Sequence, residues 1–360
     1  MNKFGKNVLM LLCLVLSASV HGAVKNKGVF IIYPVKVDDG PVTVYKVYEN
    51  GDTKMIMQIQ SDGLPEAAGG GERFPMASPD NRHIAYCEGE AVLVRDAEEG
   101  SPRKIFVSRG SSSGLINGWS RDGKKLLYHI VEMAADESGE YDNQPAGRPV
   151  GKAEEGIKPG YYIYDTGSGA SVPAGIKGKF ICWGLGYDMV CQFPEESPGE
   201  LVNIDISGTL KPLFKYRGKG KSELNQISLD SASSKAVAVA GTAGQTSGVI
   251  LIDFLKVTSV GVTGSGPWGR FLLPGISPDG TKISWMEGDY DRKERSYIYS
   301  TFVVNGKIVF KTRDYLDEYK WISNSAVAIV TRSDENVNST DELYVINAET
   351  GKISGMTPLK

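Results

Sequence analysis

The chain has 360 residues, of which 41% are hydrophobic, 23% charged and 9% aromatic, a balance that excludes an extended disordered or fibrous protein. The formal net charge of −3 gives no overall positive field, so we expect no nucleic-acid partner. Because the chain has only three histidines and four cysteines, we expect no metal site and no other cofactor.

Residues 1–22 have the three parts of a secretory signal peptide. Two lysines precede an apolar run at Val8–Leu16, and small residues follow, which places the predicted cleavage after Gly22. The apolar run is shorter than the ~20 residues that a membrane-spanning helix needs. We therefore expect residues 23–360 to form a periplasmic or secreted protein without a membrane span.

Three alternating apolar segments follow within residues 28–60, and they are typical of β-strands. Asp39-Gly40 and Asn50-Gly51 are the hairpin turns expected between them. The unit has the pattern of a four-stranded sheet that lacks its innermost strand. We expect either the C-terminal tail, Met356–Lys360, or residues 23–28 to supply that strand.

A turn phrase recurs along the rest of the chain. Its clearest copy is Ser277-Pro278-Asp279-Gly280, and further copies begin at Ser78 and Ser120. Proline fixes φ at the second turn position, aspartate bonds its own backbone, and glycine or asparagine takes a positive φ. Residues of alternating character follow each copy, so each phrase is predicted to be a tight turn between two strands.

A third strand is predicted after each phrase, as at Tyr161–Asp165 and at Leu343–Asn347. A short fourth strand is predicted to follow it. Such units begin near residues 73, 115, 178, 223, 270 and 318. Repeated four-stranded antiparallel units of about 40–50 residues are typical of β-propellers, in which stacked sheets bury one another's faces. Together with the unit at residues 28–60, these six units predict an all-β propeller of seven blades, formed by residues 23–360. Six blades with an additional edge hairpin is the alternative.

The phrase at Ser277–Trp285 resembles the repeat of TolB-like propellers, which are related to tryptophan–aspartate repeats. The resemblance covers most of the chain after the signal peptide. It implies a docking module, although similar propellers also form lid domains of serine peptidases and occasional lyases. TolB itself carries an α/β domain before its propeller, and we expect that domain to be absent here because the first strand follows soon after the predicted cleavage.

Two cysteines flank a predicted turn at Gly186-Tyr187. If that turn forms, Cys182 faces Cys191 across two strands, and the pair could form a disulfide in an oxidising compartment. Ala85 and Ser284 stand at the position equivalent to Cys191 in other units. The alternative is therefore that both cysteines are small buried side chains.

The loops between blades carry a second regularity, because each has at least one cation. These cations are Arg73, Arg109, Lys179, Arg217, Arg270 and Arg313. Loops between blades lead into the innermost strands, so these side chains should ring one mouth of the central channel, with Trp268 beside them. The same face carries the acidic insertion Met133–Gly160, and long loops on a rigid scaffold often carry function.

The sequence thus predicts a cationic channel mouth inside an acidic rim, which would accept a carboxylate-bearing ligand. The alternative is that the cations pair with the rim acids or point outward. We expect a binding or docking module without catalysis, and its partner would be an envelope or extracellular protein or an acidic glycan. The alternative function is a hydrolase or lyase acting on a polysaccharide, which for glycoside hydrolysis needs two carboxylates roughly 5–10 Å apart.

Overall fold

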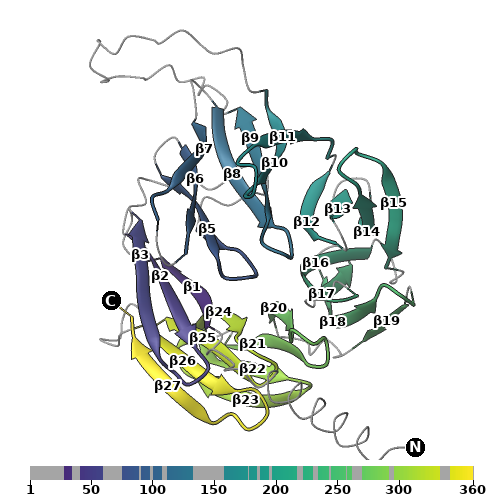
Figure 1. Ribbon diagram of the computed structural model, residues 1–360. Coiled ribbons are helices and arrows are strands. Elements are labelled where there is room, and N and C mark those ends of the chain that lie inside the picture. The colour runs from purple at the N-terminus through teal and green to yellow at the C-terminus, as the bar shows by residue number, and fades with distance from the viewer. Residues whose placement is uncertain are drawn as a thin grey trace, which may run out of the picture.

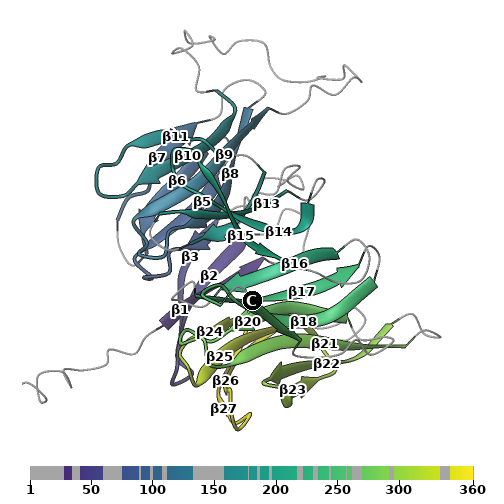
Figure 2. The same cartoon turned by 90° about the vertical axis from the view of Figure 1, so that its right-hand side faces the viewer.

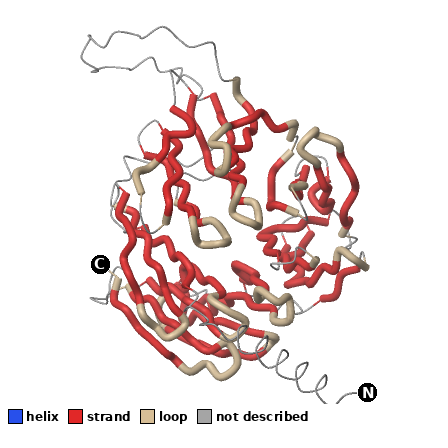
Figure 3. Tube along the Cα trace, in the orientation of Figure 1, coloured by secondary structure: helices blue, strands red, loops and turns tan. Residues whose placement is uncertain are grey.

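The computed structural model describes most of the chain after the predicted signal peptide. The described residues are 28–34, 41–59, 75–88, 91–97, 100–107, 112–132, 158–176, 178–184, 187–193, 197–216, 222–229, 234–242, 245–256, 258–261, 270–291, 296–332 and 341–359. Within them the structure has seven antiparallel sheets and no helix (Figure 3). The sheets stand around a central axis as the blades of a seven-bladed β-propeller (Figures 1 and 2). The predicted fold class and blade number are confirmed, and the six-bladed alternative is wrong.

The strands follow one another through the sheets in chain order. The first sheet holds β1 (Gly28–Pro34), β2 (Val42–Tyr48) and β3 (Thr53–Ile59). The second holds β4 (Met76–Ala77), β5 (His83–Glu88), β6 (Ala91–Asp96) and β7 (Arg103–Val107). The third holds β8 (Ser112–Trp119), β9 (Lys125–Glu132), β10 (Gly160–Asp165) and β11 (Ser171–Ala174). The fourth holds β12 (Lys179–Trp183), β13 (Met189–Phe193), β14 (Ser197–Ile204) and β15 (Leu210–Lys215).

The remaining three sheets complete the ring. The fifth holds β16 (Ser222–Leu229), β17 (Lys235–Thr242), β18 (Gln245–Asp253) and β19 (Thr258–Gly261). The sixth holds β20 (Arg270–Ile276), β21 (Ile283–Asp291), β22 (Ser296–Val304) and β23 (Lys307–Thr312). The seventh holds β24 (Tyr315–Trp321), β25 (Ala326–Arg332), β26 (Glu342–Asn347) and β27 (Ile353–Pro358). In every sheet each strand pairs with the next along the chain, so the blades are simple meanders.

The turn phrase joins the first two strands of a blade and is held by one repeated set of hydrogen bonds. In the copy at Ser277, the serine hydroxyl donates to Asp279 Oδ1 at 2.6 Å and accepts from the backbone N–H of Lys282 at 2.9 Å. The copies at Ser78 and Ser120 repeat both bonds. The fourth residue has a positive φ in each copy, 57° at Asn81 and 70° at both Gly123 and Gly280. The turn chemistry predicted from the sequence is therefore confirmed.

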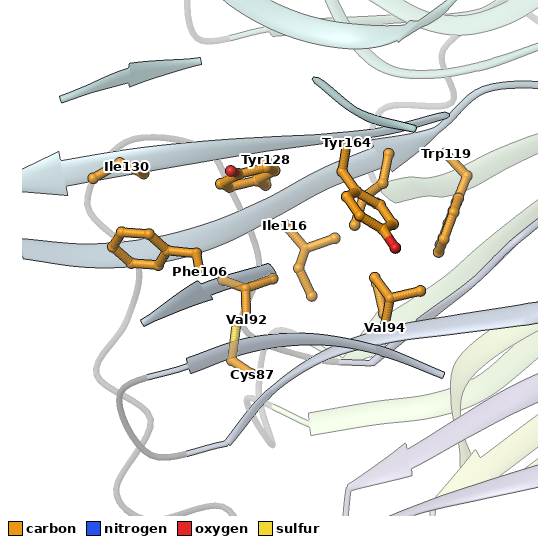
Figure 4. Packing of buried hydrophobic residues seen from close by; sticks show 11 residues of the cluster. Cys87, Val92, Val94, Phe106, Ile116, Trp119, Tyr128, Ile130 and Tyr164 are labelled. Carbon is orange, nitrogen blue, oxygen red and sulfur yellow. The ribbon is translucent and has the colours of Figure 1, made fainter. Parts of the chain in front are cut away.

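Apolar side chains from neighbouring sheets fill the spaces between blades. Figure 4 shows one such cluster, in which Val92 and Phe106 of the second sheet pack against Ile116 and Tyr128 of the third. Tryptophans at the ends of inner strands add a hydrogen bond to the preceding blade. Trp119 Nε1 donates to the Met76 carbonyl at 2.9 Å, and Trp183 Nε1 to the Gly118 carbonyl at 3.0 Å. These bonds join each of these two sheets to the sheet before it.

The first sheet has three strands where the other six have four. Its β2–β3 turn lies beside the first turn of the seventh blade, because the hydroxyls of Ser323 and Ser325 both donate to Glu49 Oε1 at 2.9 Å. In the order of the other blades, β1, β2 and β3 therefore take the second, third and fourth positions. Among the described residues the innermost position of this blade has no strand, as the sequence predicted.

The expectation that the C-terminal tail fills this position is wrong. Met356 lies in β27 and is paired with Tyr344 of β26, so the tail is the outermost strand of the seventh blade. The other expected source, residues 23–28, lies outside the described residues except for Gly28, which begins β1. The predicted signal peptide also lies outside them. No helix in the described part of the chain is long and apolar enough to cross a membrane.

Buried side chains close the ring between the first and seventh blades. Ile31, Tyr45 and Val47 of the first sheet pack against Ala328 and other buried residues of the seventh. Leu359, the residue before the last, is 4% exposed and belongs to the same cluster. We call this contact the closing interface. No described strand is shared across it, so its strength depends on apolar burial and a few side-chain hydrogen bonds.

Candidate functional site

A cavity of about 610 Å³ is lined by residues of strands that stand around the central axis. Five blades line it, through Val29–Phe30, Ala77–Pro79 and Asn81, Ile227–Ser228, Leu273–Ile276 and Glu318–Trp321. The turn phrase at Ser78 and the last residue of β24, Trp321, place it at the end of the inner strands where the turn phrases lie. We call it the axial cavity.

The charged groups of the axial cavity are an ion pair on β24. Lys320 Nζ lies 3.1 Å from Glu318 Oε1 and also donates to the Phe30 carbonyl of β1 at 3.2 Å. Alternate residues of a strand point to the same face, so Glu318 and Lys320 share one face. Their opposite charges compensate each other, and the cavity therefore carries a hydrogen-bonding pair without a net charge.

Aromatic side chains form part of the wall and are fixed by hydrogen bonds. The Tyr319 hydroxyl donates to the Leu273 carbonyl at 2.6 Å, and its ring lies edge-on to Phe302 with centroids 4.6 Å apart. Burial raises the pKa of Tyr319, so this hydroxyl stays protonated and keeps donating at physiological pH. Trp321 Nε1 donates to Ser284 Oγ at 3.0 Å. These bonds thus hold both aromatic side chains in place on this side of the wall.

One backbone position in the wall is strained. Leu273 has φ of 47°, a left-handed conformation that residues with a Cβ rarely adopt. It stands at an irregularity of the β20–β21 pairing between Leu272 and Gly275, and its side chain is 39% exposed although it is apolar. Strained residues of this kind persist where the surrounding structure imposes them, and they are frequent at binding sites.

The predicted cationic mouth lies at the opposite end of the inner strands. Lys179 and Arg270 are the first residues of the inner strands β12 and β20, and Arg313 comes two residues before the inner strand β24. The side chains of Lys179 and Arg313 are exposed. The other predicted residues, Arg73, Arg109, Arg217 and Trp268, lie outside the described residues, as does the side chain of Arg270. The mouth stays a prediction.

Cys182 and Cys191 are free thiols in this structure. A bulge between Phe180 and Cys182 pairs Cys182 with Val190 and Phe180 with Cys191. Cys182 accordingly packs with the cluster on one side of the fourth sheet, and Cys191 with the cluster on the other side. The face-to-face arrangement expected from the sequence is therefore not formed. Among the described residues, no three His, Cys, Asp or Glu side chains gather where they could hold a metal ion.

Burial should make both thiols unreactive in the folded protein. It raises the pKa of Cys191 from 9.0 to about 12 and raises that of Cys182 as well. Because only the thiolate is alkylated, we expect Cys191 to react roughly 10³-fold more slowly at pH 8 in the native protein than in urea. Iodoacetamide labelling followed by mass spectrometry of peptides measures this. Recovery of a Cys182–Cys191 crosslinked peptide without reductant would contradict the expected pair of free thiols.

No protein-family model and no curated protein matches the chain. Among solved structures, an oligogalacturonate lyase from Vibrio parahaemolyticus is similar with a TM-score of 0.53 and 14% identity, over 88% of this chain and 90% of the lyase. A dipeptidyl peptidase 4 from Porphyromonas gingivalis is similar with a TM-score of 0.51 and 12% identity, over 91% of this chain and 50% of the peptidase. The chain thus spans half the length of that peptidase.

The fold is a seven-bladed propeller. At these identities a structural likeness shows the fold and nothing about activity. A TolB from Acinetobacter baumannii also matches, with a TM-score of 0.42 and 14% identity, over 89% of this chain and 77% of that protein. The turn phrase resembles that of TolB-like propellers, and the seven sheets show the propeller fold without assigning the chain to a particular family.

Proposed function

We propose that this protein is an exported β-propeller that acts as a binding module and holds its ligand in the axial cavity. The observation that carries the proposal is the cavity itself. Its volume of about 610 Å³ is within the ~300–1,000 Å³ of ligand sites. Such sites usually have mainly apolar walls and a few placed polar groups, and Leu273, Trp321 and the Glu318–Lys320 pair follow this pattern.

Export is proposed on the strength of the leader at residues 1–22, which has the organisation of a secretory signal. The partner would then be a protein or an acidic glycan of the envelope or the exterior. A carboxylate-bearing ligand would be attracted by the cationic mouth, which lies at the far end of the same inner strands. Lys179 and Arg270 support this route because they begin β12 and β20, and Arg313 lies two residues before β24.

The alternative function is catalysis on a polysaccharide, and the similarity to a lyase over 90% of that enzyme's length gives a reason to test it. Glycoside hydrolysis needs two carboxylates that flank the bond. Glu318 is the single carboxylate among the described residues that line the cavity, and the Tyr319 hydroxyl is already bonded to a backbone carbonyl. We therefore expect no hydrolysis of oligogalacturonate when product chains are separated by size.

Filling the axial cavity should abolish binding. Ser228 lines the cavity on β16 and is half-buried, so Ser228→Trp would place an indole in the space. We expect the variant to lose at least tenfold in recovery of the partners that the wild-type protein captures from envelope extract, measured by quantitative mass spectrometry. The matched control is Ser259→Trp, because Ser259 is exposed on β19 of the same blade.

The control should capture partners like the wild type, and both variants should show the wild-type far-ultraviolet circular dichroism. A second arm tests the mouth with the combined variant Arg109→Ala, Arg217→Ala and Arg270→Ala. Equal capture by this variant and the wild type would remove the cationic mouth from the proposal. Equal capture by Ser228→Trp and the wild type would contradict the axial cavity as the binding site.

A further inference from the structure

We infer that the inner edge of β1 is a docking edge, to which an extended peptide of a partner protein adds as the missing innermost strand of the first blade. This inference deepens the proposed function, on which it rests, by naming the ligand as a peptide in β-conformation. The starting observation is the three-stranded first sheet. Every other sheet has an inner strand between its second strand and the axis, whereas no described strand pairs with β1 on that side.

The backbone of β1 presents hydrogen-bonding groups on the open edge. The Phe30 carbonyl accepts from Lys320 of another blade and therefore points away from β2. In an antiparallel strand the N–H and C=O of one residue point to the same side, and this side alternates along the strand. The β1–β2 register runs without a shift from Gly28 to Pro34. The groups of Gly28, Phe30 and Ile32 therefore share the open edge.

The open edge reaches the axial cavity at Phe30. Phe30 lines the cavity although its side chain is only 1% exposed, because the ring is buried between the first and second blades. What Phe30 offers to the cavity is consequently its main chain. A strand edge with which no described strand pairs is a template for another strand, and this mode of recognition gives affinity through main-chain bonds.

The dimensions suit a short peptide strand. Gly28 and Ile32 are four residues apart, a distance of about 14 Å along an antiparallel strand. A partner strand of about five residues would reach all three open positions. Leu273 and Trp321 lie in the wall of the same cavity, so alternate side chains of the incoming strand would meet apolar surface. We therefore expect a partner segment with apolar residues at every second position.

Lys320 protects the edge while the cavity is empty. An exposed strand edge promotes aggregation unless it is covered, and Lys320 of β24 covers this edge at Phe30. Here the Lys320 ammonium group satisfies the Phe30 carbonyl and simultaneously pairs with Glu318. When a peptide N–H replaces it at Phe30, the ammonium group keeps its pairing with Glu318. The exchange therefore leaves no buried charge without a partner.

The test uses a display library of random 12-residue peptides, selected on the purified full chain. A selected peptide is then synthesised with single backbone N-methyl groups at successive positions. If the peptide adds as a strand, methylation at alternate positions should weaken binding about fivefold to tenfold each, while the positions between them tolerate it, because only alternate N–H groups face β1. Affinities are measured by isothermal titration calorimetry.

Ile32→Pro removes one donor from the open edge, and we expect it to weaken binding of the same peptide about fivefold to tenfold. The matched control is Leu210→Pro, at the first position of β15, an exposed outer strand. The control should bind like the wild type. Hydrogen exchange of the Phe30 and Ile32 amides should be fast in the free protein and slowed by the peptide.

Three results would overturn strand addition. These are a library that yields no binder, equal tolerance of N-methylation at all positions, and amides of Phe30 and Ile32 that are already protected in the free protein. If Ser228→Trp abolishes binding of the peptide but Ile32→Pro leaves its affinity unchanged, strand addition is overturned and the proposed binding module is retained. A peptide indifferent to both variants would contradict both proposals.

Discussion

Replacing Trp119 with alanine is expected to lower the free energy of unfolding by about 3–5 kcal/mol. Trp119 is 6% exposed and lies in the cluster between the second and third blades (Figure 4). The substitution removes a large buried side chain and leaves a cavity that the surrounding strands can fill only in part. It also removes the hydrogen bond to the Met76 carbonyl, which ties the third blade to the inner strand of the second.

Urea unfolding followed by tryptophan fluorescence and circular dichroism measures the loss. Trp119→Phe retains most of the ring but not the donor, so we expect it to cost less, with about 1 kcal/mol from the lost hydrogen bond. The control is Leu255→Ala, because Leu255 is 77% exposed and should change stability little. A loss below about 1 kcal/mol for Trp119→Ala would contradict its place in the inter-blade core.

The second large effect is expected at the closing interface. Ala328 has no exposed surface and packs among residues of the first and seventh blades. Ala328→Asp would place a carboxylate there without a partner. An uncompensated buried charge of this kind lowers the free energy of unfolding by about 3–5 kcal/mol. We expect the ring to open between these blades, and limited proteolysis should then cut the first blade before the others.

The pH dependence separates charge from size in this variant. Burial raises the pKa of an introduced carboxyl group, so the folded variant holds a proton that the unfolded chain releases near its ordinary pKa. The loss in free energy of unfolding relative to the wild type should therefore be larger at pH 8 than at pH 5. Thr350→Asp, at an exposed turn of the same blade, is the matched control and should show no such difference. A deficit independent of pH would indicate a purely steric effect.

The turn phrase could be predicted because its chemistry is local. Ser277, Asp279 and Lys282 make their hydrogen bonds within six consecutive residues, so the sequence alone contains all the partners. The same reasoning identified the incomplete first blade, since a strand signature was missing between the leader and residue 28. It could not say what fills the gap, because the tail at Met356 carries no signal that distinguishes an outer strand from an inner one.

The axial cavity was not predicted, although one signal pointed to it. The sequence-based hypothesis placed function at the cationic mouth, and the missing inner strand was treated only as a question of ring closure. The cavity depends on residues as distant in the chain as Phe30 and Lys320, and on the left-handed conformation of Leu273. Neither is visible in a local pattern. The bulge beside Phe180 likewise shifts the register of Cys182 by one residue.

The closing interface has a consequence for the behaviour of the ring at low temperature. Neighbouring blades elsewhere are successive in the chain, whereas the first and seventh share no described strand and are held together mainly by the buried cluster around Ile31 and Ala328. The attraction between apolar surfaces weakens on cooling. The chilled protein should therefore visit an arc-shaped form in which the blades stay folded, and warming should restore the circle.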